Sequence, residues 1–214
     1  MQSAPPSASP SSAAAVVFDI GGVLSAPEGA VPAVAAALDL PVEVVGAAYW
    51  PSRDAYDAGG ALADYWDAVG TGLGLDLSDR AAELDALDAE RWARTGPEAD
   101  ALLAEVVPAV RERGMKLAVL SNAPASLEGV VRASAWSQPF DVLVFSAALG
   151  VAKPDPAVYE AVERALDLPG DQLVFFDDRP VNVEAARARG WRAHVWQGAD
   201  GARQHLLDEG VLSG

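Results

Sequence analysis

The chain has 214 residues and is 51% hydrophobic, enough apolar material for one folded domain or for one domain with a smaller insert. Its net charge of −16 argues against a nucleic-acid or anionic-membrane surface, because clustered Lys and Arg bind such phosphate-rich partners. It has no cysteine, which excludes disulfides, thiolate zinc sites and cysteine nucleophiles. Its two histidines, His194 and His205, both lie near the C-terminus, which disfavours a Ser-His-Asp hydrolase or a histidine metal site.

The first stretch, residues 1–13, is rich in Pro, Ser and Ala and lacks the positive charge that begins a signal peptide. We expect it to form a flexible tail. No stretch of the chain reaches the roughly 20 apolar residues of a membrane span. These observations predict a cytoplasmic protein.

From residue 14 onward, short apolar runs alternate with helical stretches. Each run is too short for a helix and is expected to be a buried strand; the runs are 14–19, 117–120, 142–145, 173–176 and 193–196. Helices are predicted between and after the later runs, at about 124–135, 155–167, 180–189 and 200–208. This alternation of strand and helix predicts an α/β fold with a parallel sheet flanked by helices.

One long interruption, from about residue 27 to 95, has only Ala-, Leu-, Asp- and Glu-rich helical patterns broken by Pro and Gly. A helical insert directly after the first strand is expected to form a cap over the site. The predicted domains are therefore the flexible tail 1–13, an α/β core of 14–26 and 96–214, and a helical cap of 27–95.

Polar residues follow four of the predicted sheet elements, where an open parallel sheet binds its ligands. In chain order they are Asp19, Ser121 with Asn122, the loop holding Lys153, and Asp177 with Asp178. Taken singly, Asp19 is also compatible with an Asx-turn, Ser121 with a helix N-cap and Lys153 with an ordinary turn. The adjacent acids are harder to explain in that way, because their charges repel and a bound cation would relieve the repulsion.

Together and in this order, the four stretches resemble the motifs of the haloacid dehalogenase-like hydrolase superfamily. The matching stretches are Phe18-Asp19-Ile20-Gly21-Gly22-Val23-Leu24, Leu120-Ser121-Asn122, Lys153-Pro154-Asp155-Pro156 and Phe176-Asp177-Asp178-Arg179-Pro180-Val181-Asn182. The resemblance extends from about residue 14 onward and implies a Rossmann-like three-layer core with an inserted α-helical cap. In style the chain is most similar to small sugar-phosphate phosphatases of the glucose-1-phosphate phosphatase type.

The resemblance also implies a role for each matching residue. Asp19 would attack phosphorus and form an aspartyl-phosphate, assisted by Lys153. Mg²⁺ would be held by the side chains of Asp19 and Asp178 and the carbonyl of Gly21, with Asp177 and Asn182 around its water shell. The phosphoryl oxygens would be bound by Ser121, Asn122, Lys153 and the amides around Gly21 and Gly22.

Gly21 departs from the usual family pattern. Most phosphatases of the family have an acid at this position, which protonates the leaving oxygen and then activates water, a role worth about 10²–10⁴-fold in rate. Three explanations remain open: a good leaving group such as an anomeric phosphate, an acid supplied by the cap, or slow or absent turnover.

An aromatic-rich segment lies in the predicted cap, from Tyr49 through Arg53 to Tyr65 and Trp66. One interpretation is a substrate pocket in which Arg53 binds an anion and the rings stack on a sugar. The other, which the helical spacing favours, is that the rings form the core of the cap. Arg53 is the best single candidate for a specificity residue.

The leading hypothesis is a Mg²⁺-dependent phosphatase acting on a small, sugar-phosphate-like metabolite. A 2-haloacid dehalogenase is one alternative, since that branch also lacks the second acid and attacks carbon with the same Asp, without a metal. A catalytically silent protein that binds a metabolite or partner is the other. We expect no nucleic-acid or membrane partner, and the sequence leaves the oligomeric state open.

Overall fold

The computed structural model describes residues 12–25 and 29–213. Nearly all of the predicted flexible tail, and the predicted boundary between core and cap at 26–27, lie outside the described residues.

Five parallel strands form one sheet in the order β3-β2-β1-β4-β5. Their bounds are β1 Ala15–Phe18, β2 Lys116–Ser121, β3 Val142–Phe145, β4 Leu173–Asp177 and β5 Arg192–Val195. Each predicted strand is confirmed, with its ends displaced by a residue or less. Because β1 is central, whatever follows it lies in the middle of the carboxyl edge of the sheet.

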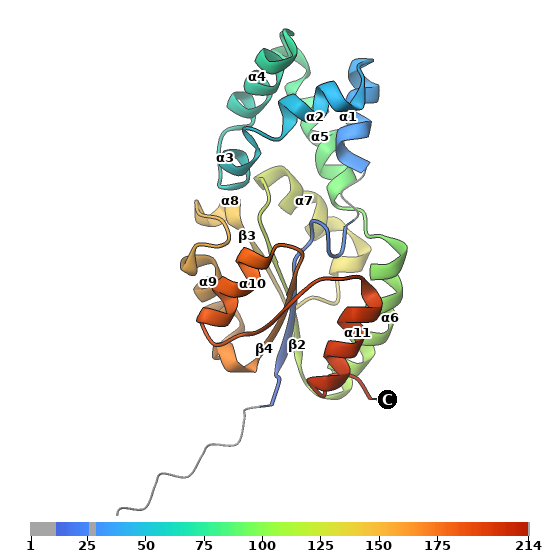
Figure 1. The fold of residues 1–214 in the computed structure, drawn as a ribbon, viewed down its shortest axis with the longest axis vertical. Coiled ribbons are helices and arrows are strands. Elements are labelled where there is room, and N and C mark those ends of the chain that lie inside the picture. Colours follow the sequence, from blue (N-terminus) through green and yellow to red (C-terminus); the bar gives the residue numbers. More distant parts are fainter. Residues whose placement is uncertain (1–11, 26–28, 214) are drawn as a thin grey trace, which may run out of the picture.

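Helices cover both faces of this sheet (Figure 1). One face packs against α6 (Pro97–Glu112), α7 (Ala125–Ala133) and α11 (Ala199–Asp208), and the other against α9 (Pro156–Leu166) and α10 (Pro180–Ala188). A short helix, α8 (Ser146–Leu149), follows β3, and 3-10 turns occupy Ser78–Arg80, Ala135–Ser137 and Gly170–Gln172. The predicted three-layer α/β architecture is therefore confirmed.

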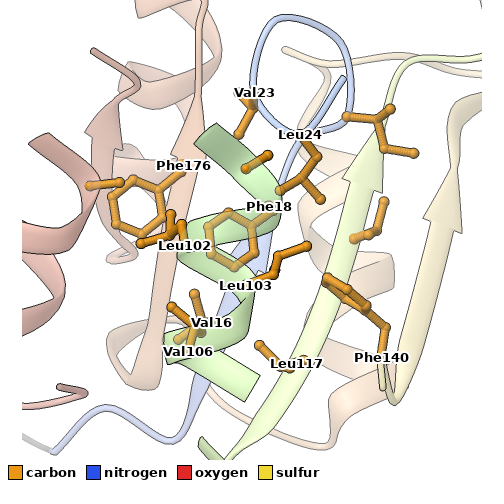
Figure 2. Close-up of a cluster of buried hydrophobic side chains, with 14 of the residues drawn as sticks. Val16, Phe18, Val23, Leu24, Leu102, Leu103, Val106, Leu117, Phe140 and Phe176 are labelled. Carbon is orange, nitrogen blue, oxygen red and sulfur yellow. The ribbon is translucent and has the colours of Figure 1, made fainter. Parts of the chain in front are cut away.

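Side chains of β1 alternate between the two faces, as strand geometry requires. Val16 and Phe18 belong to the apolar cluster on the α6 side, whereas Ala15 and Val17 belong to the cluster on the α9 side. Figure 2 shows the first cluster, in which Leu102 and its neighbours on α6 pack against the rings of Phe18 and Phe176 from the sheet. Because β1 is buried on both faces, the loop that follows it has a fixed position at the carboxyl edge of the sheet.

Five further helices lie together beyond the carboxyl edge of the sheet (Figure 1). They are α1 (Ala30–Leu38), α2 (Val42–Tyr49), α3 (Arg53–Asp57), α4 (Leu62–Leu73) and α5 (Ala81–Trp92). Their apolar side chains form a third cluster, with Trp66 and Leu84 among its fully buried members. No single helix in the described ranges is both long and apolar enough to cross a membrane; the bent pair α1 and α2 satisfies that test by length and composition alone.

The packing of α6 on the sheet gives a direct stability prediction. Leu102 is 2% exposed, and Leu102→Ala is expected to lower the free energy of unfolding by about 2–5 kcal/mol because it leaves a cavity under α6. Leu75, which is 43% exposed, provides the control, and Leu75→Ala should change the free energy by no more than about 0.5 kcal/mol. Urea denaturation of the two variants measures both values. Equal effects would contradict this description of the core.

Candidate active site

Asp19 lies at the carboxyl end of the central strand. Its backbone N–H donates to the carbonyl of Phe176 at 2.9 Å, which continues the pairing of β1 with β4 by one residue. The residue is 7% exposed. The sheet therefore holds this carboxylate in a fixed, mostly buried position facing the helices above.

Lys153 is the buried cation of the site. Its ammonium donates to Asp19 Oδ1 at 2.8 Å, to Asp177 Oδ2 at 2.7 Å and to the Leu120 carbonyl at 2.9 Å. An ammonium has three N–H donors, so these contacts use all of them. Lys153 therefore connects the ends of β1, β2 and β4 through three contacts of its ammonium group.

The pKa values follow from burial and from these charges. Burial raises the pKa of Asp19 to about 7 against the attraction of Lys153, and the neighbouring Asp177 adds to the rise. Burial alone would lower the pKa of Lys153, but the carboxylates of Asp19 and Asp177 raise it above its ordinary value. Burial, with repulsion from Asp177, also raises the pKa of Asp178. The lysine therefore stays cationic among three acids that repel one another.

Asn122 holds the segment that carries the lysine. Its side-chain Nδ2 donates to the Lys153 carbonyl at 3.0 Å, and its Oδ1 accepts from the Lys153 N–H at 2.7 Å. Ser121, 2% exposed, ends β2 beside it. In the structure the Asn122 amide thus positions Lys153, and its predicted contact with phosphate stays a prediction.

Three carboxylates come together at this edge in a way that suits a cation. Oxygens of Asp19, Asp177 and Asp178 lie within 4.8 Å of one another. Asp177 Oδ1 accepts from the Arg179 N–H and from Asn182 Nδ2, both at 2.9 Å, which fixes its orientation. Asn182 Oδ1 is buried and has no hydrogen-bond partner among the described residues. Carboxylates and an unpaired carbonyl oxygen are the donors that Mg²⁺ and its water shell prefer, so the residues fit that ion.

The two glycines after Asp19 are constrained differently. Gly22 has a φ of +72°, and a Cβ on it would lie 2.6 Å from Asp178 Oδ2. This position needs glycine both for its backbone conformation and for the space that the acid occupies. Gly21 has an ordinary φ, and its Cβ would lie 3.4 Å from Cζ3 of Trp92, a normal contact. The space beside Gly21 is therefore filled by the Trp92 ring at the end of α5.

A cavity of about 440 Å³ lies between these strand ends and the helices beyond them. Its walls include every predicted site residue except Asp177, which is fully buried against Lys153. From the helical insert, the walls include Trp50, Arg53, Asp54, Asp57 and Trp92. The predicted residues of the core and of the helical insert thus face one space.

Most of the aromatic segment forms the core of the insert. Tyr49, Tyr56, Tyr65 and Trp66 are all buried in the third apolar cluster, which agrees with the second interpretation of the sequence. Trp50 differs, since it is 50% exposed and lines the cavity. Arg53 also lines the cavity, with its guanidinium bound by Asp57 and Asp88, and its role in binding substrate stays a prediction.

Several cavity residues were not found from the sequence. Asp54 and Asp57 stand among other acids on a short helix, and Trp92 lies far along the chain from the loop it contacts. Arg179 was quoted only as part of the last motif. The spacing of four residues between Arg53 and Asp57 is a local signal for an ion pair, but that these residues line the cavity depends on how the helical insert packs over the sheet.

A family model described as haloacid dehalogenase-like hydrolase matches residues 13–190. Among characterised proteins, a phosphatase of Mycobacterium tuberculosis is 34% identical over 145 residues, which is 64% of this chain and 65% of that protein. An (S)-2-haloacid dehalogenase of Pseudomonas is 35% identical over 124 residues, which is 56% of this chain and 49% of that enzyme. The chain thus spans between about half and two thirds of the length of these relatives.

Solved structures share the fold at low sequence identity. A family enzyme of Bacteroides thetaiotaomicron superposes with a TM-score of 0.68 at 20% identity, covering 92% of this chain and 99% of that one. The same enzyme has been solved in complex with magnesium and inorganic phosphate, with a TM-score of 0.61 at 19% identity over 86% of this chain and 93% of that one. The L-2-haloacid dehalogenase of Xanthobacter autotrophicus superposes with a TM-score of 0.69 at 21% identity, covering 92% of this chain and 83% of that one.

The contrast between the two glycines can be tested by adding one methyl group to each. Gly22→Ala is expected to lower the free energy of unfolding by at least about 1–2 kcal/mol, the cost of a left-handed backbone for an L-residue. It should also reduce whatever rise in Tm added Mg²⁺ produces in the wild type, because the new methyl group displaces Asp178. Gly21→Ala, whose methyl group meets only Trp92 at a normal distance, is the matched control. If Gly22→Ala kept the stability and the Mg²⁺ response of the wild type, position 22 would not need glycine for its backbone conformation or for the space that Asp178 occupies.

Proposed function

The chain belongs to the haloacid dehalogenase-like hydrolases, and we propose that it removes phosphate from a small phosphorylated metabolite, such as a sugar phosphate, with the help of Mg²⁺. The observation that carries the proposal is the cluster of Asp19, Asp177 and Asp178 around the cationic Lys153. Relatives named as phosphatases also support this proposed activity. We further propose that α1 to α5 act as a cap that covers the site.

In the proposed reaction Asp19 is the nucleophile. Its carboxylate oxygen attacks phosphorus, and the bond from phosphorus to the leaving oxygen breaks. The leaving oxygen takes a proton, and water then attacks the phosphorus of the aspartyl-phosphate to give inorganic phosphate and free Asp19. Burial of Asp19 at the end of β1 keeps its oxygen directed at the cavity throughout.

Lys153 would keep the nucleophile ionised, and the N–H that contacts Asp19 would turn to a phosphoryl oxygen as Asp19 bonds to phosphorus and negative charge develops there. Ser121 and the amides after Asp19 would bind the remaining oxygens. Asp19, Asp178 and the Gly21 carbonyl would hold Mg²⁺, with Asp177 and Asn182 behind them. When bound, this ion would neutralise negative charge on the phosphoryl group.

Gly21 gives the proposed enzyme no acid next to the nucleophile. Trp92 fills the adjoining space, which is consistent with a site organised around glycine. The proton for the leaving oxygen would then come from water or from a cavity carboxyl on α3, and an activated leaving group such as an anomeric phosphate would need it least.

A 2-haloacid dehalogenase is the second candidate, and Gly21 is the observation that favours it. Relatives of that activity match this chain at similar identity. In that reaction Asp19 would displace halide from carbon without a metal, which would leave Asp178 without a role, since Asp177 would still pair with Lys153. We therefore rank it below the phosphatase.

A substrate panel with and without metal separates the candidates. Phosphate release from a set of phosphate monoesters is expected with Mg²⁺, and both EDTA and Asp19→Asn should reduce it by on the order of 10³-fold or more. Asp64→Asn, which removes the same charge from an exposed position on α4, is the control and should keep wild-type activity.

Other outcomes of the panel are equally informative. Phosphate release that survives EDTA or Asp19→Asn would contradict the proposed mechanism. Halide release from 2-haloacids without metal would favour the dehalogenase. No turnover of either substrate class would favour a silent binding protein.

A further inference from the structure

Arg53 is a cation of the helical insert that lines the cavity, where an anion-binding residue would stand, but two carboxylates already surround it. Its Nε donates to Asp57 Oδ1 at 2.7 Å, and its Nη1 donates to Asp88 Oδ2 at 2.8 Å and to the Tyr49 hydroxyl. The side chains of Arg53, Asp57 and Asp88 are 7%, 13% and 1% exposed. Water therefore screens these charges only weakly.

The charges of this group do not sum to a cationic site. Burial would lower the pKa of Arg53, but Asp88 and its other neighbours raise it well above the ordinary value, so the guanidinium stays charged. Burial raises the pKa of Asp57 to about 6, with Arg53 opposing the rise, which leaves this carboxylate ionised above neutral pH. Burial also raises the pKa of Asp88, again with Arg53 opposing the rise. Two carboxylates against one guanidinium give the group a net negative charge when both are ionised.

Other charges on the cavity wall do not reverse this sign. Asp54, exposed on the same helix, adds another negative charge. Lys153 is fully engaged with Asp19 and Asp177 at the opposite, phosphate-binding end. Arg179 is exposed and lies at the N-cap of α10, at the strand end that carries Asp178, so its charge does not belong to the α3 side of the cavity. A second anionic group on a substrate would meet repulsion beside α3.

The same wall is well suited to an uncharged group. Arg53 Nη2 has no hydrogen bond within the part of the chain that the structure describes, and the residue lines the cavity, so its N–H groups remain to donate to a neutral oxygen. Trp50 and Leu127 add apolar surface to the same cavity. Hydrogen-bond donors beside an aromatic ring match a hydroxyl-bearing carbon skeleton.

We propose that the cavity selects phosphate monoesters of uncharged alcohols and rejects those that carry a carboxylate, and that Asp57 determines this specificity by neutralising Arg53. The inference rests on the proposed phosphatase function and adds to it a substrate class and a residue that sets it. Asp57 acts here through the charge of Arg53.

Competition between two nearly identical esters tests the proposal. Glycerol 2-phosphate and 2-phosphoglycerate differ in one group, a hydroxymethyl in the first and a carboxylate in the second. Each is added as a competitor of p-nitrophenyl phosphate hydrolysis by the wild-type protein with Mg²⁺. The inhibition constant for glycerol 2-phosphate is expected to be lower by about 10-fold or more, as like-charge repulsion predicts.

Three variants assign the effect to Asp57. Asp57→Asn should reduce the ratio of the two constants toward one, because it leaves Arg53 with a single carboxylate. Asp64→Asn removes the same charge from an exposed position on α4, away from the cavity wall, and should keep the wild-type ratio within about 2-fold. Asp57→Glu, which keeps the charge, should retain the preference. A ratio of constants within one variant does not depend on how much of it is folded.

The outcomes separate this inference from the function on which it rests. Equal inhibition by the two esters, or tighter binding of 2-phosphoglycerate, in the wild type would overturn the inference and leave the phosphatase intact. An equal change in Asp64→Asn and Asp57→Asn would overturn the role of Asp57. Failure of the wild type to hydrolyse p-nitrophenyl phosphate at all would overturn the proposed function, and the inference with it.

Discussion

The site depends on one buried cation held between two buried carboxylates. Lys153 contacts Asp19 and Asp177 within 2.8 Å, and all three residues are at most 7% exposed. Leaving one such charge unpaired would be costly, so the three residues constrain one another. The parallel sheet makes the arrangement possible, because β1 and β4 are neighbours and the residues at their ends necessarily lie side by side. Asn122 adds the last restraint by holding the backbone of the lysine segment.

The helical insert contributes a second set of charges above the first. Arg53, Asp57 and Asp88 form a group of the same kind as Lys153 and its carboxylates, with one cation between two acids. Trp92 connects the two sets, since its ring touches the space beside Gly21 and its Nε1 donates to the Tyr49 hydroxyl at 2.9 Å. The Trp92 ring thus lies in contact with the position that a side chain at Gly21 would occupy.

The sheet and the residues at its strand ends could be predicted from the sequence, because apolar runs, their spacing and the polar residues that follow them are local signals. The environment of Arg53 could not. Asp57, four residues after Arg53 on α3, has a local signal, but Asp88 lies on α5, and nothing in a run of Asp-rich helical sequence indicates which acids turn inward. The same holds for Trp92 and Gly21, and for the Asn122 side chain, whose hydrogen bonds to Lys153 join loops 31 residues apart. These contacts depend on tertiary packing between residues far apart in the chain, which the sequence pattern does not indicate.

The central claim is that Asp19 becomes covalently phosphorylated during turnover. The most direct measurement is acid quenching of the protein in the first turnover with a phosphate monoester and Mg²⁺, followed by peptide mass mapping. The account predicts a phosphoryl group on the peptide that contains Asp19, absent when the reaction is quenched after the substrate is exhausted. Phosphate release without any phosphorylated peptide, or a phosphoryl group on another residue, would contradict it.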